Sequence, residues 1–118
     1  FQFTTGDKIE VELLVDTSND YEYMVLEDFK PAGLEALQTR SGYDANTGTF
    51  IEFRDRKVCF FLRLLPQGRH NYTYRLRAET PGSYSALPAI ISAMYAPELT
   101  GNSDEARVEV REQKTTEP

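Results

Sequence analysis

The stretch KIEVELLVD, residues 8–16, decides the fold class, because an apolar side chain occupies every second position along it. Ile9, Val11, Leu13 and Val15 alternate with residues that are mostly charged. A period of two is typical of a β-strand, whose successive side chains point to opposite faces. One face of this strand is therefore predicted to enter a core, while the other stays in water.

Strand patterns recur through the rest of the chain. Residues 70–79 and 106–111 repeat the half-buried alternation, whereas residues 21–27 and 57–65 are apolar on both faces, as in central strands. Turn signals separate the runs. The expected strands are residues 8–16, 21–27, 50–54, 57–65, 70–79, 83–87, 89–95 and 106–111.

This spacing predicts an all-β protein, a single antiparallel β-sandwich of the Ig-like type with about eight strands. Asp55-Arg56 is expected to form a tight hairpin turn, and Pro88 to mark a bend or a sheet edge. The one long connection runs from Phe29 to Gly48. Within it, residues 31–37 are expected to form a single helical turn.

Length and charge narrow the class of protein further. The 118 residues suit one domain, which we expect to span residues 1–112, with a disordered tail over residues 113–118. The formal net charge of −6 argues against a nucleic-acid partner, which would require clustered Lys and Arg. No apolar run reaches the ~18–20 residues of a membrane span, so direct membrane insertion is not expected. We expect the chain to be a segment of a longer protein, with any targeting signal elsewhere.

Residue types that carry catalysis are sparse. His70 is the only His and is expected to be an ordinary surface residue, and Cys59 is the only Cys and is expected to pack as a small hydrophobe. Asp44-Ala45-Asn46-Thr47-Gly48 lacks the bidentate Glu of a calcium loop and predicts a turn. We therefore expect that the domain is not an enzyme and holds no metal ion or cofactor. Its function is expected to come from a contact surface.

SAMYAPELTG, residues 92–101, is the candidate for that surface, because Met94 and Tyr95 stand where a strand gives way to a loop. One interpretation is packing, with Tyr95 joining Ala93 and its alternating neighbours on the buried face while Met94 fills an edge gap. The other is a contact surface. Adjacent strand residues point to opposite faces, so both side chains can cover one spot only if the strand ends there, and Pro97 is placed to end it.

Taken together, segments spread over nearly the whole chain resemble the C-terminal macroglobulin-like domain, of the MG10 type, of bacterial alpha-2-macroglobulins. The combination is more specific than any one segment. The matching segments are residues 6–11 (GDKIEV), 25–34 (VLEDFKPAGL), 52–58 (EFRDRKV), 65–68 (LPQG), 72–78 (YTYRLRA), 80–84 (TPGSY) and 87–98 (LPAIISAMYAPE).

The resemblance implies a macroglobulin-like sandwich that packs against a thioester domain in a protease-trapping protein. Its partners would be that domain, neighbouring macroglobulin domains of the same parent chain and, indirectly, target proteases. The Met-Tyr loop would shield the thioester, with Met94, Tyr95, Pro97 and Glu98 as the contact residues. The parent protein would be periplasmic or at the cell surface, with a lipid anchor as one option.

Two departures limit what the resemblance implies. Cys59 is followed by Phe60-Phe61-Leu62 rather than by a thioester motif, so this domain does not hold the reactive bond. Residues 31–48 contain no Lys, so the receptor binding of animal counterparts is not expected. Two other functions stay open, an Ig-like spacer module of a surface or adhesin protein and a carbohydrate-binding module. The latter would need exposed tyrosines, whereas Tyr21, Tyr23, Tyr72 and Tyr74 are expected in the core.

Overall fold

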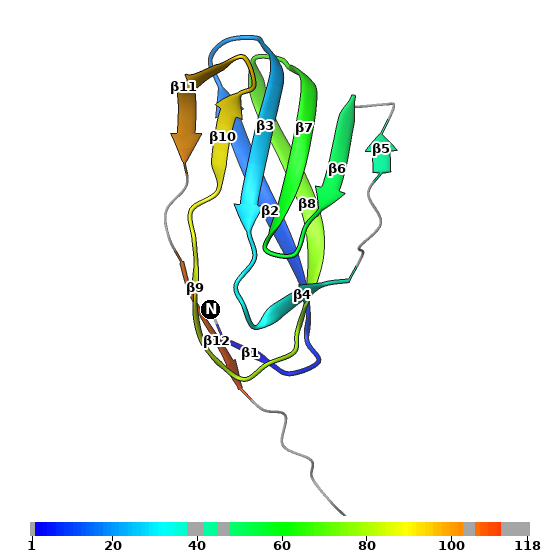
Figure 1. The fold of residues 1–118 in the computed structure, drawn as a ribbon, viewed down its shortest axis with the longest axis vertical. Helices are drawn as coiled ribbons and strands as arrows, with labels where there is room; N and C mark the ends of the chain where they lie inside the picture. The colour runs from blue at the N-terminus through cyan, green and yellow to red at the C-terminus, as the bar shows by residue number, and fades with distance from the viewer. Residues whose placement is uncertain (1, 38–41, 45–47, 103–105, 112–118) are drawn as a thin grey trace, which may run out of the picture.

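Residues 2–37, 42–44, 48–102 and 106–111 are described by the computed structural model, and every regular element within them is a β-strand (Figure 1). The expected tail, residues 113–118, lies outside this part of the chain. The strands are β1 (Gln2–Thr4), β2 (Lys8–Thr17), β3 (Tyr21–Phe29), β4 (Leu34–Ala36), β5 (Gly42–Asp44), β6 (Thr49–Phe53), β7 (Lys57–Leu65), β8 (Gly68–Ala78), β9 (Gly82–Ala86), β10 (Ile90–Ala93), β11 (Ala96–Asn102) and β12 (Ala106–Arg111).

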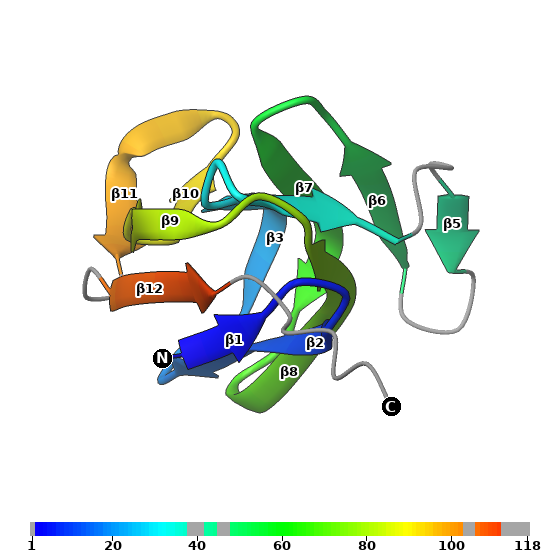
Figure 2. The same ribbon diagram turned by 90° about the horizontal axis from the view of Figure 1, so that it is seen from below.

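The strands form three sheets. The largest has the order β11-β10-β3-β7-β6-β5, and it faces a second sheet with the order β2-β8-β4 (Figure 1). A small sheet, β1-β12-β9, lies at one end of the molecule, nearest the viewer in Figure 2. The strand pairs are antiparallel except for β1 and β12, which pair in parallel. The predicted all-β sandwich is confirmed, with this one parallel pair added.

The core lies between the facing sheets and follows the alternation in the sequence. On β8, Tyr74, Leu76 and Ala78 are buried, and their neighbours of the opposite parity are exposed. The predicted inward residues of β2 pack against this core. Phe60 and Leu62 of β7 are almost completely buried, as expected of a strand between β3 and β6. Burial of this apolar area is the main term that stabilises the sandwich.

More strands are present than the eight expected, because short elements carry no readable period. Strands β1, β4 and β5 have three residues each, and β11 contains Pro97. The single helical turn expected at residues 31–37 is wrong. A tight turn with a hydrogen bond from Leu34 N to Pro31 O (3.1 Å) leads directly into β4, which pairs with β8 and buries Leu34.

The predicted turns connect the expected strands. Asp55-Arg56 joins β6 to β7, closed by a hydrogen bond from Arg54 N to Lys57 O (2.9 Å). The stretch around Pro88 separates β9, in the small sheet, from β10, in the large one. Proline there removes no ladder hydrogen bond, which is why the chain can change sheets at this point.

Candidate interaction surface

The turn between β10 and β11 consists of Met94 and Tyr95 and lies at the end of the large sheet farthest from the small sheet (Figure 1). Ala93 pairs with Ala96 across the hairpin, and Met94 N donates a hydrogen bond to Tyr23 O of β3 (2.9 Å). Met94 is 38% exposed and Tyr95 82%. Tyr95 therefore does not join Ala93 on the buried face, and both side chains project from a hairpin tip.

Methionine and tyrosine are unusual residues for such a turn. Two-residue hairpin turns favour Gly and Asn, because the common types require a positive φ. Tyr23 is the only non-glycine residue of the described chain with a positive φ. Met94 and Tyr95 therefore do not adopt the positive φ that the common turn types require. Large apolar side chains at an exposed turn are also poorly matched to water. The turn therefore presents two large side chains that neither the turn geometry nor the core requires.

Beside the turn, the edge strand β11 is irregular. Ala93 pairs with Ala96 but Ser92 pairs with Thr100, so residues 97–99 form no register pair with β10. Pro97 lies in this interruption, where the missing N–H breaks no ladder bond. The prediction that Pro97 ends the strand before the turn is wrong, because β10 ends at Ala93 and Pro97 belongs to the returning strand. The side chains of Pro97 and Glu98 lie outside the described part.

Tyr23 is the residue of this surface that the sequence did not predict. It is 41% exposed rather than in the core, and its ring lies edge-on to that of Tyr95, with centroids 5.6 Å apart and planes at 80°. We call Tyr23, Met94 and Tyr95 the apolar tip. The other tyrosines considered with Tyr23 follow the prediction better: Tyr74 is buried, and Tyr21 and Tyr72 pack against the core.

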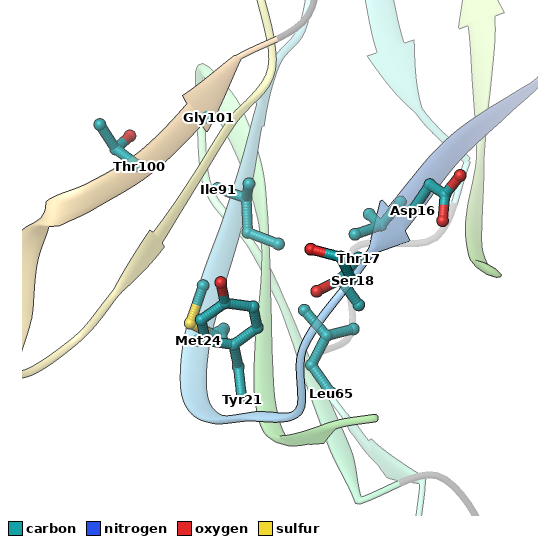
Figure 3. A pocket seen from close by; sticks show the side chains of 10 residues that line it. Asp16, Thr17, Ser18, Tyr21, Met24, Leu65, Ile91, Thr100 and Gly101 are labelled. Atoms are coloured by element: carbon teal, nitrogen blue, oxygen red, sulfur yellow. The ribbon is translucent and has the colours of Figure 1, made fainter. Parts of the chain in front are cut away.

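A cleft of about 280 Å³ opens near the tip, between the end of β2 and strands β3, β10 and β11 (Figure 3). Tyr21, Met24 and Ile91 form one wall and face the end of β2 across the opening (Figure 3). On the β2 side, Thr17 Oγ1 donates a hydrogen bond to Asn19 O (2.8 Å), so this hydroxyl is already engaged by the β2–β3 turn. The cleft is thus apolar on the β3 and β10 side and polar on the β2 side, where Asp16, Thr17 and Ser18 line it.

The candidate reactive residues occupy ordinary structural positions. His70 Nε2 donates a hydrogen bond to Pro66 O (2.6 Å) and so anchors the β7–β8 turn. Cys59 is buried within β7, and this burial raises the pKa of its thiol, which disfavours the nucleophilic thiolate. Among the described residues, no group of three His, Cys, Asp or Glu side chains is placed to hold a metal ion.

Asp28 and Tyr74 form a part-buried polar pair that links the two facing sheets. Tyr74 of β8 donates its hydroxyl hydrogen bond to Asp28 Oδ2 of β3. Burial raises the pKa of Asp28, and the hydrogen bond from Tyr74 opposes part of that rise. Burial, together with the nearby carboxylate, raises the pKa of Tyr74 above its ordinary value. The pair satisfies its own hydrogen bonding and fits a structural role between the sheets.

These features define the class of protein: an Ig-like β-sandwich domain with an exposed apolar hairpin tip. The family described as the bacterial alpha-2-macroglobulin MG10 domain matches residues 2–98, and the chain belongs to this family. The family named from the sequence segments is thereby confirmed.

Relatives of known sequence include proteins much longer than this chain. An alpha-2-macroglobulin of Xylella fastidiosa is 31% identical, and the match covers 81% of this chain and 7% of that protein. Circularly permutated Ras protein 2 of Dictyostelium discoideum is 30% identical, covering 89% of this chain and 3% of its own. The chain therefore corresponds to a small part of each of these two relatives.

Solved structures support the fold. A mutant of Salmonella alpha-2-macroglobulin superposes with a TM-score of 0.80 at 22% identity, and the methylamine-reacted form of that protein with 0.76 at 24%. Each match covers 92% of this chain and 8% of the solved chain. At these identities the likeness establishes the sandwich fold, which matches a small part of each solved chain. No helix long and apolar enough to cross a membrane occurs in the described residues.

Proposed function

We propose that this chain is a non-enzymatic interaction domain of a bacterial alpha-2-macroglobulin-like protease inhibitor. It packs on the thioester domain of the same parent chain and shields the thioester through Met94 and Tyr95. The match spans 7% of the Xylella fastidiosa alpha-2-macroglobulin and 8% of the Salmonella one, so we assign inhibition to the parent protein and shielding to this domain.

The observation that carries the proposal is the exposed Met-Tyr turn. A thioester persists only while water and amines are excluded from it. Two large apolar side chains on a narrow hairpin can enter and seal a shallow site, because they combine a polarisable thioether with an aromatic ring. The Tyr95 hydroxyl remains free to find a polar partner at the rim.

The proposed surroundings follow from the family. The partners are the thioester domain and neighbouring macroglobulin domains, with target proteases engaged only indirectly through the whole inhibitor. The parent protein works in the periplasm or at the cell surface. Pro97 and Glu98 follow the tip directly in β11 and are proposed to complete the contact.

The alternative of a structural spacer module in an adhesin is not favoured, because the matching family covers residues 2–98 of this chain. The parent sequence separates the two functions. A Cys-x-Glu-Gln motif N-terminal to this domain supports the shielding function, whereas tandem copies of this sandwich without that motif support a spacer.

The direct test uses the full-length parent protein with Met94→Ala/Tyr95→Ala. Release of the thioester thiol is followed over time in buffer and in methylamine, the amine with which the Salmonella relative was reacted. The matched control is Asp55→Ala/Arg56→Ala, which truncates the other two-residue hairpin turn of the same sheet. We expect at least about tenfold faster thiol release in the tip variant, since seal contacts of ~1.4 kcal/mol or more are lost. The control variant should behave as wild type.

Equal rates in wild type and in Met94→Ala/Tyr95→Ala would show that the turn does not protect the thioester. Acceleration of the same size in the control would point to a general loosening of the domain rather than to a seal. Thermal melting of each variant accompanies the rate measurement, so that unfolding is recognised.

A further inference from the structure

Tyr23 combines an unfavourable backbone with a place directly beneath the turn. Its φ of 55° lies in the left-handed region, where side chains with a Cβ are disfavoured and a bulky aromatic is rare. A residue is held in such a conformation only when its surroundings require it, and such positions cluster at functional sites. The surrounding strand pairing of β3 with β7 and β10 must therefore offset the cost.

The left-handed residue reverses which face of β3 points inward. Met24 and Leu26 are buried on one face of β3. In a regular strand Tyr21, three residues before Met24, would lie on the opposite face, and yet it also packs against the core. The register between β3 and β7 passes from Glu22↔Leu64 to Met24↔Leu62 and omits Tyr23. Tyr23 is thus released from the sheet face, and its ring turns toward the neighbouring hairpin.

Both residues of the turn are in contact with Tyr23. Its carbonyl oxygen accepts the hydrogen bond from Met94 N (2.9 Å), which extends the β3–β10 ladder one step into the turn. Its ring meets the Tyr95 ring in a T-shaped arrangement at 5.6 Å, within the favourable range for aromatic pairs. One residue therefore fixes the backbone of Met94 and the side chain of Tyr95.

We propose that Tyr23 is a positioning residue that holds the Tyr95 ring in its sealing orientation before the domain docks. The inference rests on the proposed shielding function. An 82% exposed ring without a neighbour would sample several rotamers, and its immobilisation would have to occur on docking. The edge-on contact fixes the ring in advance, so less of the contact free energy is lost to ordering.

A purely structural role for Tyr23 makes different predictions. If Tyr23 only stabilised the hairpin, its loss would lower the melting temperature and act independently of Tyr95. If it acts through Tyr95, its loss should matter only while the Tyr95 ring is present. A double-mutant cycle separates these two cases.

The experiment measures thiol release in methylamine for the full-length parent protein carrying Tyr23→Phe, Tyr23→Gly, Tyr95→Ala or Tyr23→Gly/Tyr95→Ala. Glycine adopts φ near +55° without strain, so Tyr23→Gly removes the ring and keeps the backbone path. We expect Tyr23→Phe to match wild type and Tyr23→Gly to release thiol about two- to tenfold faster, the range set by one aromatic contact. The double variant should be no faster than Tyr95→Ala.

The remaining outcomes distinguish a failure of the positioning role of Tyr23 from a failure of the shielding function. Acceleration by Tyr95→Ala but not by Tyr23→Gly overturns the positioning role and leaves the shielding function standing. No acceleration by Tyr95→Ala or by Met94→Ala/Tyr95→Ala overturns the shielding function, and the positioning role with it. Additive acceleration in the double variant, or a loss in Tyr23→Phe equal to that in Tyr23→Gly, also overturns positioning through the ring. If Tyr23→Gly does not fold, Tyr23→Asn replaces it, because Asn tolerates the left-handed region.

Discussion

Two hairpin turns at opposite ends of the large sheet have opposite chemistry, although each consists of two residues. At the tip end, the β10–β11 turn presents Met94 and Tyr95 to solvent. At the base end, the β6–β7 turn is Asp55-Arg56, and Lys57 Nζ pairs with Glu27 Oε2 at 2.6 Å beside it. The base end follows the usual rule that turns are polar and charges are paired. The Met94-Tyr95 turn breaks that rule, which supports the contact proposed for it.

The surroundings of the two turns also differ in how tightly their residues are packed. Near the base end, Gly33 lies under the ring of Tyr84, whose hydroxyl donates a hydrogen bond to Thr80 O (3.0 Å). A Cβ on Gly33 would lie 2.2 Å from Tyr84 Cε2 and 2.8 Å from Thr80 O. The tip end shows no such crowding around Tyr95, which is 82% exposed. Gly33 is therefore enclosed by its neighbours, whereas the side chain of Tyr95 is available for contact.

Gly33→Ala should give the largest effect on stability. The added methyl group must displace a ring and a backbone carbonyl, so we expect a loss of about 1–3 kcal/mol in the free energy of unfolding. Urea unfolding of the 118-residue chain measures this loss. Gly42→Ala is the control, because nothing lies within 4 Å of its Cβ position. Similar losses for both variants would show that the base end is not tightly packed around Gly33.

Asp28→Asn tests the buried pair at the base end through its pH dependence. Because the pKa of Asp28 is raised in the folded protein, the folded state binds more protons, and the stability of the wild type falls as pH rises from ~4 through that raised pKa. Asparagine does not titrate and can still accept the Tyr74 hydrogen bond. The stability of Asp28→Asn relative to wild type should therefore increase between pH 4 and pH 8. Denaturant unfolding at several pH values measures it, and a difference independent of pH would contradict the raised pKa.

Met94→Asn/Tyr95→Gly replaces the tip with residues typical of a hairpin turn. We expect the free energy of unfolding to stay within about 1 kcal/mol of wild type, because both positions are exposed at a turn, where substitutions change stability little. In the full-length parent protein the same change should accelerate thioester loss. A variant of unchanged stability and unchanged thioester lifetime would remove the functional difference between the two ends.

Asp55→Ala/Arg56→Ala and the single change Tyr95→Ala should have the smallest effects on stability. Both sites are exposed turns, where substitutions typically change stability by no more than about 0.5 kcal/mol. Thermal melting of the 118-residue chain compares the two. A clearly larger drop in melting temperature for Tyr95→Ala would mean that its ring stabilises the fold, through Tyr23 or another contact, although the ring is exposed.

Several elements were predictable because their residues repeat with a strand period over enough positions. Strands β2, β7 and β8 have nine or more residues each, and their inward faces match the apolar positions of the sequence. The three-residue strands were not predictable, since β4 forms by pairing Leu34–Ala36 with β8 rather than by local propensity. The same pairing replaced the expected helical turn.

The candidate surface was predictable only in part. The sequence drew attention to Met94 and Tyr95 because a Met and a Tyr are unexpected where a strand ends. It gave no sign of Tyr23, which stands in an ordinary apolar run, YEYMVLE, at residues 21–27. A left-handed tyrosine has no local signature, because the conformation is imposed by the pairing of β3 with β7 and β10.

By itself, the sequence determined the sandwich class, the order of its long strands and the family, because alternation of apolar residues and turn chemistry are local properties of the chain. The tertiary structure decided that Met94 and Tyr95 form the turn itself and that Pro97 lies in the returning strand. It also decided that Tyr23 meets Tyr95 across two neighbouring strands. The contact between Tyr23 and Tyr95 depends on the pairing of segments some seventy residues apart in the chain, and that register is fixed by packing rather than by local propensity.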